Sequence, residues 1–121
     1  MLTVGIYISS DNKKPFSLWH ADLHDIRARV KIDIAVARLQ LGNVGDSKPV
    51  GDGVHELRID YGPGYRLYYG NDGRTLIILL CGGDKRSQKK DILKAKEYWR
   101  DYMIRKKLSQ RESGHEKKNK R

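Results

Sequence analysis

Residues 54–81 contain three short apolar segments separated by two turn sequences, and this pattern limits the folds open to the chain. The segments are residues 54–60, 65–70 and 74–81. The separators, YGPG and NDG, are rich in glycine, which adopts the positive φ angles of hairpin turns without steric cost. Strands joined by such short turns pair antiparallel. The sequence therefore predicts an antiparallel meander.

The rest of the chain predicts one further strand and three helices. Residues 2–8 are rich in β-branched residues, which favours a strand. Apolar residues recur every three or four positions after Pro15, Asp25 and Ser87, as on the buried face of a helix. Residues 44–53 contain three glycines and a proline and are expected to form a loop. The order β-α-α-β-β-β-α predicts a small α+β domain whose helices pack on one face of an antiparallel sheet.

The 121 residues are enough for one domain, and their formal net charge of +10 suggests a polyanionic partner. Residues 104–121, IRKKLSQRESGHEKKNKR, hold eight Lys or Arg against two Glu, which is +6 of that charge. This segment has no apolar periodicity after Leu108, so we expect a basic, disordered tail that is solvating or generally adhesive. The domain is therefore assigned to residues 1–103, which keep a moderate charge of +4.

Several protein classes are excluded. The chain has no run of about 18 apolar residues and no secretory signal at its start, so a soluble, cytoplasmic protein is expected. Cys81 is the only cysteine, which excludes an intramolecular disulfide and a thiolate metal cluster, and we expect it to be buried. No phosphate-loop pattern is present. The four histidines lack metal-like spacing, and no metal or cofactor is expected; His55 is predicted on the inner side of its strand.

Strand alternation predicts the register of the second and third segments. Leu57 must lie opposite Leu67 for the apolar positions to share a face, because a one-residue slip would turn one strand outward. On the other face, this register opposes two further pairs, Arg58 with Arg66 and Glu56 with Tyr68.

Two arginines directly opposed across a ladder are destabilising, which leaves two interpretations. In the structural one, both face water and neighbouring acidic residues, Glu56 and Asp60, offset them. In the functional one, Arg58 and Arg66 bind phosphate, because a guanidinium matches phosphate oxygens, and Tyr68 faces outward to stack on or hydrogen-bond a nucleotide.

The segment GGDKRSQKKD, residues 82–91, follows the last predicted strand and adds positive charge. Its glycines are expected to turn the chain sharply, and a helix starting near Ser87 would add free N–H groups and a positive dipole end. Alone, this segment would be a solvated loop; beside the two arginines it indicates the rim of an anion site. Its cations are Lys85, Arg86, Lys89 and Lys90.

Taken together, the motifs LGN-GD-KPVG, ELRI, GPGYR and GGDK-SQ-KDI make the chain resemble the RelE/ParE superfamily of type II toxin-antitoxin toxins. It is most similar to the HigB-like branch, or addiction-module killer proteins, over roughly residues 1–100. The resemblance implies a small α+β toxin whose RelE-type relatives cleave mRNA in the ribosomal A site without a metal. In such toxins the 2′-hydroxyl attacks the adjacent phosphate, and basic residues on the sheet stabilise the developing charge.

The resemblance also implies roles for individual residues. Arg66 matches the family's strand arginine, Arg58 a basic position on the preceding strand, and Lys85 or Arg86 the basic site after the last strand. RelE has a second basic residue where this chain has Glu56, and a late catalytic tyrosine where this chain has lysines. Glu56, or a lysine with a pKa depressed by cationic neighbours, is then the candidate general base. We predict catalytic roles for Arg58, Arg66, Lys85 and Glu56, and RNA-binding roles for Tyr68, Arg86, Lys89 and Lys90.

The expected function is that of a toxin acting as a ribosome-dependent mRNA endonuclease that inhibits translation. Two alternatives remain open: a ParE-like, non-catalytic gyrase inhibitor, and a module that binds RNA without cutting it. The resemblance further implies a cognate antitoxin encoded by an adjacent gene, commonly with a helix-turn-helix domain. An acidic antitoxin segment lying over a basic groove would be electrostatically complementary.

Overall fold

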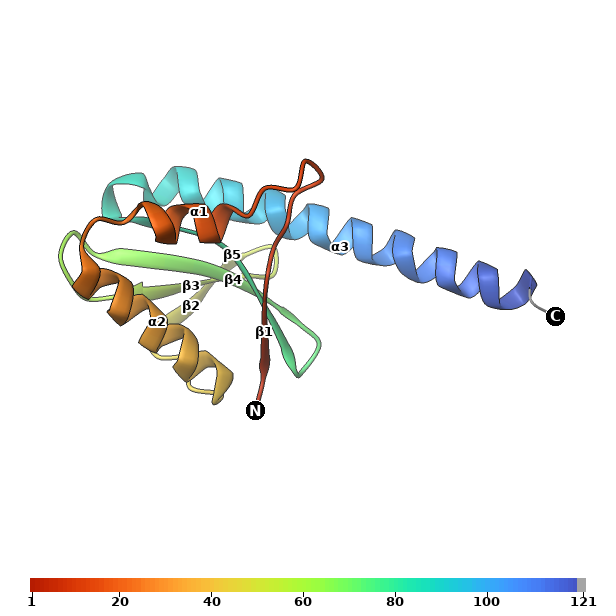
Figure 1. The fold of residues 1–121 in the computed structure, drawn as a ribbon, viewed down its shortest axis with the longest axis horizontal. Helices are drawn as coiled ribbons and strands as arrows, with labels where there is room; N and C mark the ends of the chain where they lie inside the picture. Colours follow the sequence, from red (N-terminus) through yellow and green to blue (C-terminus); the bar gives the residue numbers. More distant parts are fainter. Residues whose placement is uncertain (120–121) are drawn as a thin grey trace.

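A computed structural model describes the backbone of residues 1–119 and the side chains of residues 1–112. The elements are β1 (Thr3–Ile6), α1 (Pro15–Asp22), α2 (Ile26–Gln40), β2 (Ser47–Gly51), β3 (Val54–Ile59), β4 (Tyr65–Asp72), β5 (Leu76–Asp84), the 3-10 helix η1 (Lys85–Ser87) and α3 (Gln88–Asn119). They form one five-stranded sheet of order β1-β5-β4-β3-β2 with helices packed on it (Figure 1). Neighbouring strands are antiparallel except β1, which pairs parallel with β5. The predicted α+β class and the β3-β4-β5 meander are confirmed.

Strand β2 lies where the sequence analysis expected a loop. It forms the outer edge of the sheet and pairs with β3 on one side only. Pro49 is compatible with this position because an edge strand leaves some backbone N–H groups without a ladder partner, and the register shifts between Pro49 and Gly51. The glycine and proline residues of segment 44–53 therefore belong in part to an irregular edge strand, whereas their sequence predicted a loop.

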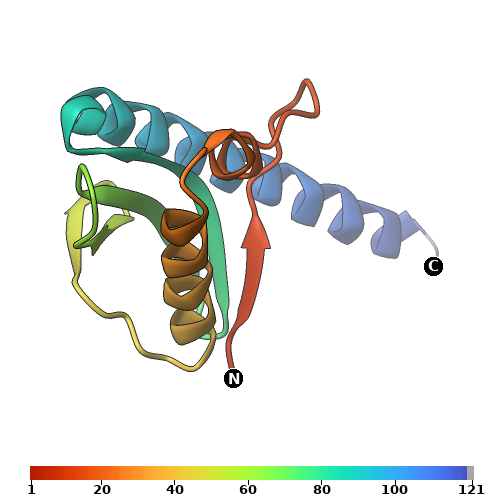
Figure 2. The same ribbon diagram turned by 60° about the vertical axis from the view of Figure 1, so that its left-hand side comes forward.

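Helices cover both faces of the sheet, whereas the sequence analysis placed them all on one. Helices α1 and α2 cover one face, and α3 crosses the other (Figure 2). The first core includes Phe16, Ile32, Leu57, Leu67, Tyr69, Ile77 and Leu79. The second includes Val54, Tyr68, Ile78, Leu80, Ala95 and Trp99. Because β5 supplies apolar side chains to both cores, it is covered on both faces, as its nearly continuous apolar sequence predicted.

The N-terminal end of α3 sits close against β5. The carboxylate of Asp84 accepts a hydrogen bond from the Arg86 backbone N–H and forms a capping box with Ser87, so the predicted cap Ser87 is one half of this arrangement. Gly82 and Gly83 belong to β5 itself and do not make the sharp turn expected of them. A Cβ on Gly83 would lie 1.8 Å from Asp91 Oδ2, so glycine is what permits α3 to approach the strand.

Residues 104–119, which belong to the tail expected to be disordered, continue helix α3. Helix α3 continues to Asn119 without a break at residue 103, and its C-terminal half projects beyond the sheet (Figure 1). Arg105 pairs with Asp101 and donates to the Ile8 carbonyl, while Lys106 pairs with Asp72 on β4. These contacts join the helix to the domain, which apolar periodicity alone did not reveal. Residues 120 and 121 of the predicted tail lie outside the described residues.

The structure also shows the surroundings of Cys81 and His55, two residues for which the sequence predicted a position. Cys81 is buried as predicted, and its burial raises the pKa of the thiol to about 12, which makes it a weak nucleophile. His55 stacks on Tyr69 of β4 with the ring centroids 5.3 Å apart. Within residues 1–119, the helices are too short or too polar to cross a bilayer.

We predict that Gly70→Ala destabilises the fold. The new Cβ would lie 2.5 Å from Trp99 Cε3, and the indole is buried and stacked on Tyr102, so it has no free space to move into. Overpacking of this kind costs about 1–3 kcal/mol. Urea unfolding followed by tryptophan fluorescence should show the loss. Asn71→Ala, an exposed neighbour on the same strand, is the control and should unfold close to the wild type.

Candidate nucleic-acid interface

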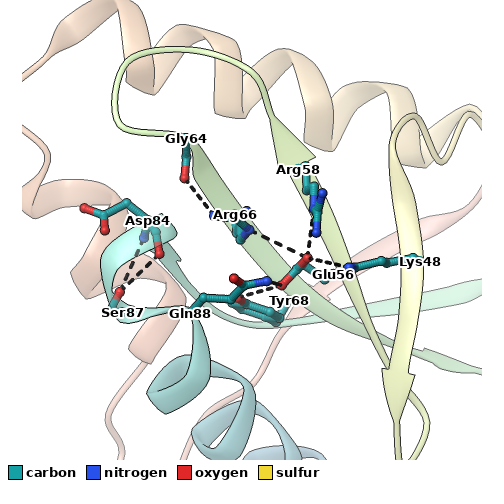
Figure 3. A network of polar contacts seen from close by, with 9 residues as sticks. All are labelled: Lys48, Glu56, Arg58, Gly64, Arg66, Tyr68, Asp84, Ser87 and Gln88. Atoms are coloured by element: carbon teal, nitrogen blue, oxygen red, sulfur yellow. Dashed lines mark hydrogen bonds and ion pairs between the residues drawn. The ribbon is translucent and has the colours of Figure 1, made fainter.

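The pairing of β3 with β4 brings the predicted site residues together. Glu56 lies opposite Tyr68 and Arg58 opposite Arg66, in the register that strand alternation predicted. The β2–β3 ladder adds Lys48 opposite Glu56. These side chains meet on the α3 side of the sheet, beside the first turn of that helix (Figure 3). Strand register and the position of α3 therefore build the site jointly.

The carboxylate of Glu56 is the centre of the site, and its side chain is 0% exposed. Three groups donate hydrogen bonds to it: Gln88 Nε2 at 3.0 Å, Arg58 Nε at 3.1 Å and the Tyr68 hydroxyl at 3.1 Å. Two further cations lie at ion-pair distance, Arg66 Nε at 3.6 Å and Lys48 Nζ at 3.9 Å. They converge on it from β2, β3, β4 and α3 (Figure 3). One buried carboxylate thus holds three cations, which we call the basic cluster: Lys48, Arg58 and Arg66.

The opposed arginines are tolerated because Glu56 lies between them. Their exposures differ: the Arg66 side chain is 9% exposed, and that of Arg58 is 40% exposed. The expectation that both face outward is therefore wrong for Arg66. Its Nη1 donates to the Gly64 carbonyl at 3.4 Å, while its Nε is buried without a hydrogen-bond partner. Glu56 offsets the repulsion between the two arginines, as the structural interpretation expected. Because one carboxylate pairs with three cations, this edge of the sheet keeps a net positive charge.

The protonation state of Glu56 follows from opposing effects. Burial raises the pKa of the carboxyl, but hydrogen bonds from Gln88, Arg58 and Tyr68 and the charge of Arg66 outweigh burial and place the pKa below its ordinary value. A general base must come within about 2.6–3.2 Å of the substrate proton. A carboxylate that is buried and occupied by donors is unsuited to that task. The structure therefore favours Glu56 as a residue that positions the arginines.

Tyr68 does not face solvent, and the expectation that it stacks on a nucleotide is wrong for this structure. The residue is fully buried under α3, which the sequence analysis had placed on the other face. Burial, together with the charge of Glu56, raises the pKa of its hydroxyl far above the ordinary value. Its hydroxyl hydrogen bond to Glu56 gives Tyr68 a structural role.

The predicted rim after β5 is exposed. Lys85, Arg86, Lys89 and Lys90 all lie on the surface at η1 and the start of α3. A Cβ on Gly64 would lie 3.8 Å from Lys85 Cβ and 3.9 Å from Arg66 Nη1, so the start of the Lys85 side chain and the Arg66 guanidinium both lie close to Gly64. Arg86 differs, because it pairs with Asp84 at 3.0 Å. The rim thus extends the basic cluster toward α3 mainly through its lysines.

Two contributors were missed by the sequence analysis. Lys48 lies on β2, which was expected to be a loop, and Gln88 is an uncharged residue inside a charged run. Reading KPVG as an edge strand would have placed Lys48 beside Glu56, whereas Gln88 carried no sequence signal. Among the described residues, no group of three His, Cys, Asp or Glu side chains is arranged to hold a metal ion, and His20 pairs with Asp33 at 2.8 Å.

We predict that Glu56→Gln lowers the free energy of unfolding by about 3 kcal/mol, because it leaves a nearly buried Arg66 without its counter-ion. The lowered pKa also fixes the sign of the pH dependence. Stability from Glu56 is present above its ordinary pKa and is lost as pH falls through the lowered folded-state value.

Wild-type protein should therefore lose more stability than Glu56→Gln between about pH 5 and pH 3, as measured by urea unfolding at each pH. Asp60→Asn removes an exposed carboxylate two positions beyond Arg58 and serves as the matched control. It should change stability by less than about 0.5 kcal/mol. Equal losses for both variants would contradict the central role of Glu56.

Residues 22–100 match the family described as Phage derived protein Gp49-like (DUF891). An uncharacterized protein of Haemophilus influenzae (strain Rd KW20) is 54% identical over 81 residues, which cover 67% of this chain and 82% of that protein. The matched residues 22–100 contain Glu56, the basic cluster and the rim, and end within α3. The chain therefore belongs to the Gp49-like (DUF891) family of phage-derived proteins.

Proposed function

We propose that this protein is the toxin of a type II toxin-antitoxin system and acts as a metal-independent, ribosome-dependent mRNA endonuclease. The observation that carries the proposal is the set of cations at this edge of the sheet: Arg58 and Arg66 pair with the buried carboxylate of Glu56 from adjacent strands, and Lys85 lies near Gly64, two residues before Arg66. Fixed cations at the edge of a protein match a phosphodiester better than mobile surface charges do.

In the proposed reaction, the RNA 2′-hydroxyl loses its proton and its oxygen attacks the adjacent phosphorus. The bond from phosphorus to the 5′-oxygen then breaks, and that oxygen takes up a proton. The products are a 2′,3′-cyclic phosphate and a 5′-hydroxyl. Negative charge rises on the phosphate oxygens in the transition state, where preorganised cations such as Arg58 and Arg66 stabilise it most.

Burial gives Arg66 a specific advantage in this role. Its guanidinium is partly desolvated, so its interaction with a nearby phosphate is weakened less by water than that of an exposed lysine. Glu56 keeps the guanidinium in place without blocking the exposed part of Arg58. The positioning residue and the phosphate-binding residues thus have separate tasks.

A cognate antitoxin is part of the proposal. We propose that it is encoded next to this gene, has a helix-turn-helix DNA-binding domain, and covers the basic cluster with an acidic segment. Electrostatic complementarity supports such a contact, because Lys85, Lys89 and Lys90 leave the surface beside the cluster positive. Co-expression of the neighbouring open reading frame should restore growth if that frame encodes the antitoxin.

A second candidate is a module that binds RNA without cutting it. One observation favours it. Glu56 and Tyr68 lie next to the arginines and could exchange protons, but both are buried and hydrogen-bonded to each other. Such a protein would inhibit translation while leaving messages intact. RNA fragmentation therefore separates it from the nuclease.

We predict that Arg66→Ala lowers RNA cleavage by about 10²–10³-fold, because it removes a preorganised charge. Induced expression followed by mapping of mRNA 5′ ends measures the effect. Arg74→Ala removes an exposed arginine from the β4–β5 turn and is the matched control, with wild-type toxicity expected.

The mapped fragments should begin with a 5′-hydroxyl, as the proposed reaction requires. Full toxicity of Arg66→Ala would overturn the assignment of Arg66. A ParE-like action would instead appear as inhibition of gyrase supercoiling by the purified protein while translation continues. Growth arrest with intact messages and active gyrase would favour the RNA-binding module.

A further inference from the structure

A second polar site lies at the edge of the sheet, on the far side of Arg58 from the rim. It is a pocket of 290 Å³ between α2, the loop of residues 43–46 and the end of β3. This volume is near the lower end of the range of ligand pockets and accommodates a group the size of a nucleobase. Leu57 and Ile59 line it from one face of β3 and Arg58 from the other, so the pocket opens at the strand edge.

The cations of the pocket are available to a ligand. Lys31 and Arg38 lie seven residues apart on α2, about two turns, and both are exposed. Among the described side chains, neither forms an ion pair with a carboxylate. Lys31 Nζ lies over the Tyr61 ring, 5.1 Å from its centroid. With Arg58 at the opening, the pocket has three cations that a phosphate could reach.

The remaining lining matches a base better than a simple anion. Ile34, Leu57 and Ile59 supply apolar surface, which an isolated phosphate does not need. Asp46 and Asp60 supply carboxylates, which repel phosphate but accept hydrogen bonds from exocyclic amino groups such as cytosine N4. The pocket therefore combines the three chemistries of a nucleotide: an apolar ring, a polar base edge and a phosphate.

The loop that forms one wall is held in place by the strand. The backbone N–H of Arg58 donates to the Asp46 carbonyl at 3.0 Å, and the Asn43 side chain accepts from the Gly45 N–H at 3.0 Å. Asn43, Gly45 and Asp46 belong to the motif LGNVGD, residues 41–46, which takes no part in the basic cluster. The pocket gives this motif a function of its own.

We propose that this pocket binds one nucleotide of the RNA, next to the nucleotide whose phosphate lies at the basic cluster. Its base packs on Leu57 and Ile59 with an amino group toward Asp46, and a flanking phosphate faces Lys31 and Arg38. Arg58 joins the two sites, because it pairs with Glu56 and also lines the pocket. The proposal rests on the proposed function for the RNA substrate and adds a subsite that selects the base.

The test is a titration of purified, full-length ¹⁵N-labelled protein with CMP, UMP or inorganic phosphate, followed by amide chemical shifts. CMP has an exocyclic amino group where UMP has a carbonyl. The comparison therefore tests whether the base donates a hydrogen bond to a carboxylate of the pocket, Asp46 or Asp60. CMP should shift the signals of residues 43–46 and 57–60 and bind more tightly than UMP. Asp46→Asn should reduce this difference.

Arg38→Gln should weaken CMP binding about fivefold, as expected for one exposed charge contact. Arg100→Gln makes the same charge change at an exposed position on α3 and should leave binding unchanged. The proposal is overturned if CMP leaves residues 43–46 and 57–60 unshifted, if UMP binds as tightly as CMP, or if inorganic phosphate produces the same shifts. The titration does not depend on cleavage. If Arg66→Ala were fully toxic while CMP produced the expected shifts, the catalytic assignment of Arg66 would be wrong and the nucleotide-binding pocket would still be supported.

Discussion

The ionised carboxylate of Glu56, buried among three hydrogen-bond donors and two further cations, is the interaction on which the site depends. Burying a charge is unfavourable unless it is paired and hydrogen-bonded, and here the pairing comes from β2, β3, β4 and α3 together. The same contacts offset the repulsion between Arg58 and Arg66. Folding thereby fixes two guanidiniums side by side, an arrangement that mobile surface side chains would not maintain.

Close packing on the α3 face makes this arrangement possible. Gly83 allows the first turn of α3 to approach β5, and Gly70 accommodates the Trp99 ring further along the helix. The helix consequently lies near enough to the strands for Gln88 to donate to Glu56. The position of the helix therefore sets both the stability of the domain and the shape of its basic edge.

The positive surface of the domain is divided between two neighbouring environments. Around Glu56 the cations are fixed by a buried counter-ion, which suits stabilisation of charge on a phosphate. In the pocket beside α2, two of the cations, Lys31 and Arg38, form no ion pair with a described carboxylate, and Leu57 and Ile59 supply apolar lining, which suits recognition of a base. Arg58 belongs to both environments, so under the proposed function it would direct an RNA strand bound at one toward the other.

The sequence by itself indicated the meander and its register, because a one-residue slip would turn the apolar face of one strand outward and separate Leu57 from Leu67. That register already placed Arg58 opposite Arg66 and Glu56 opposite Tyr68. Only the tertiary structure decided that α3 crosses this face, burying Tyr68 and Arg66 and surrounding Glu56, the candidate base, with hydrogen-bond donors. It also decided the edge strand with Lys48 and the continuation of α3 past residue 103. Local patterns specify which side chains share a face, whereas burial depends on which distant element packs there.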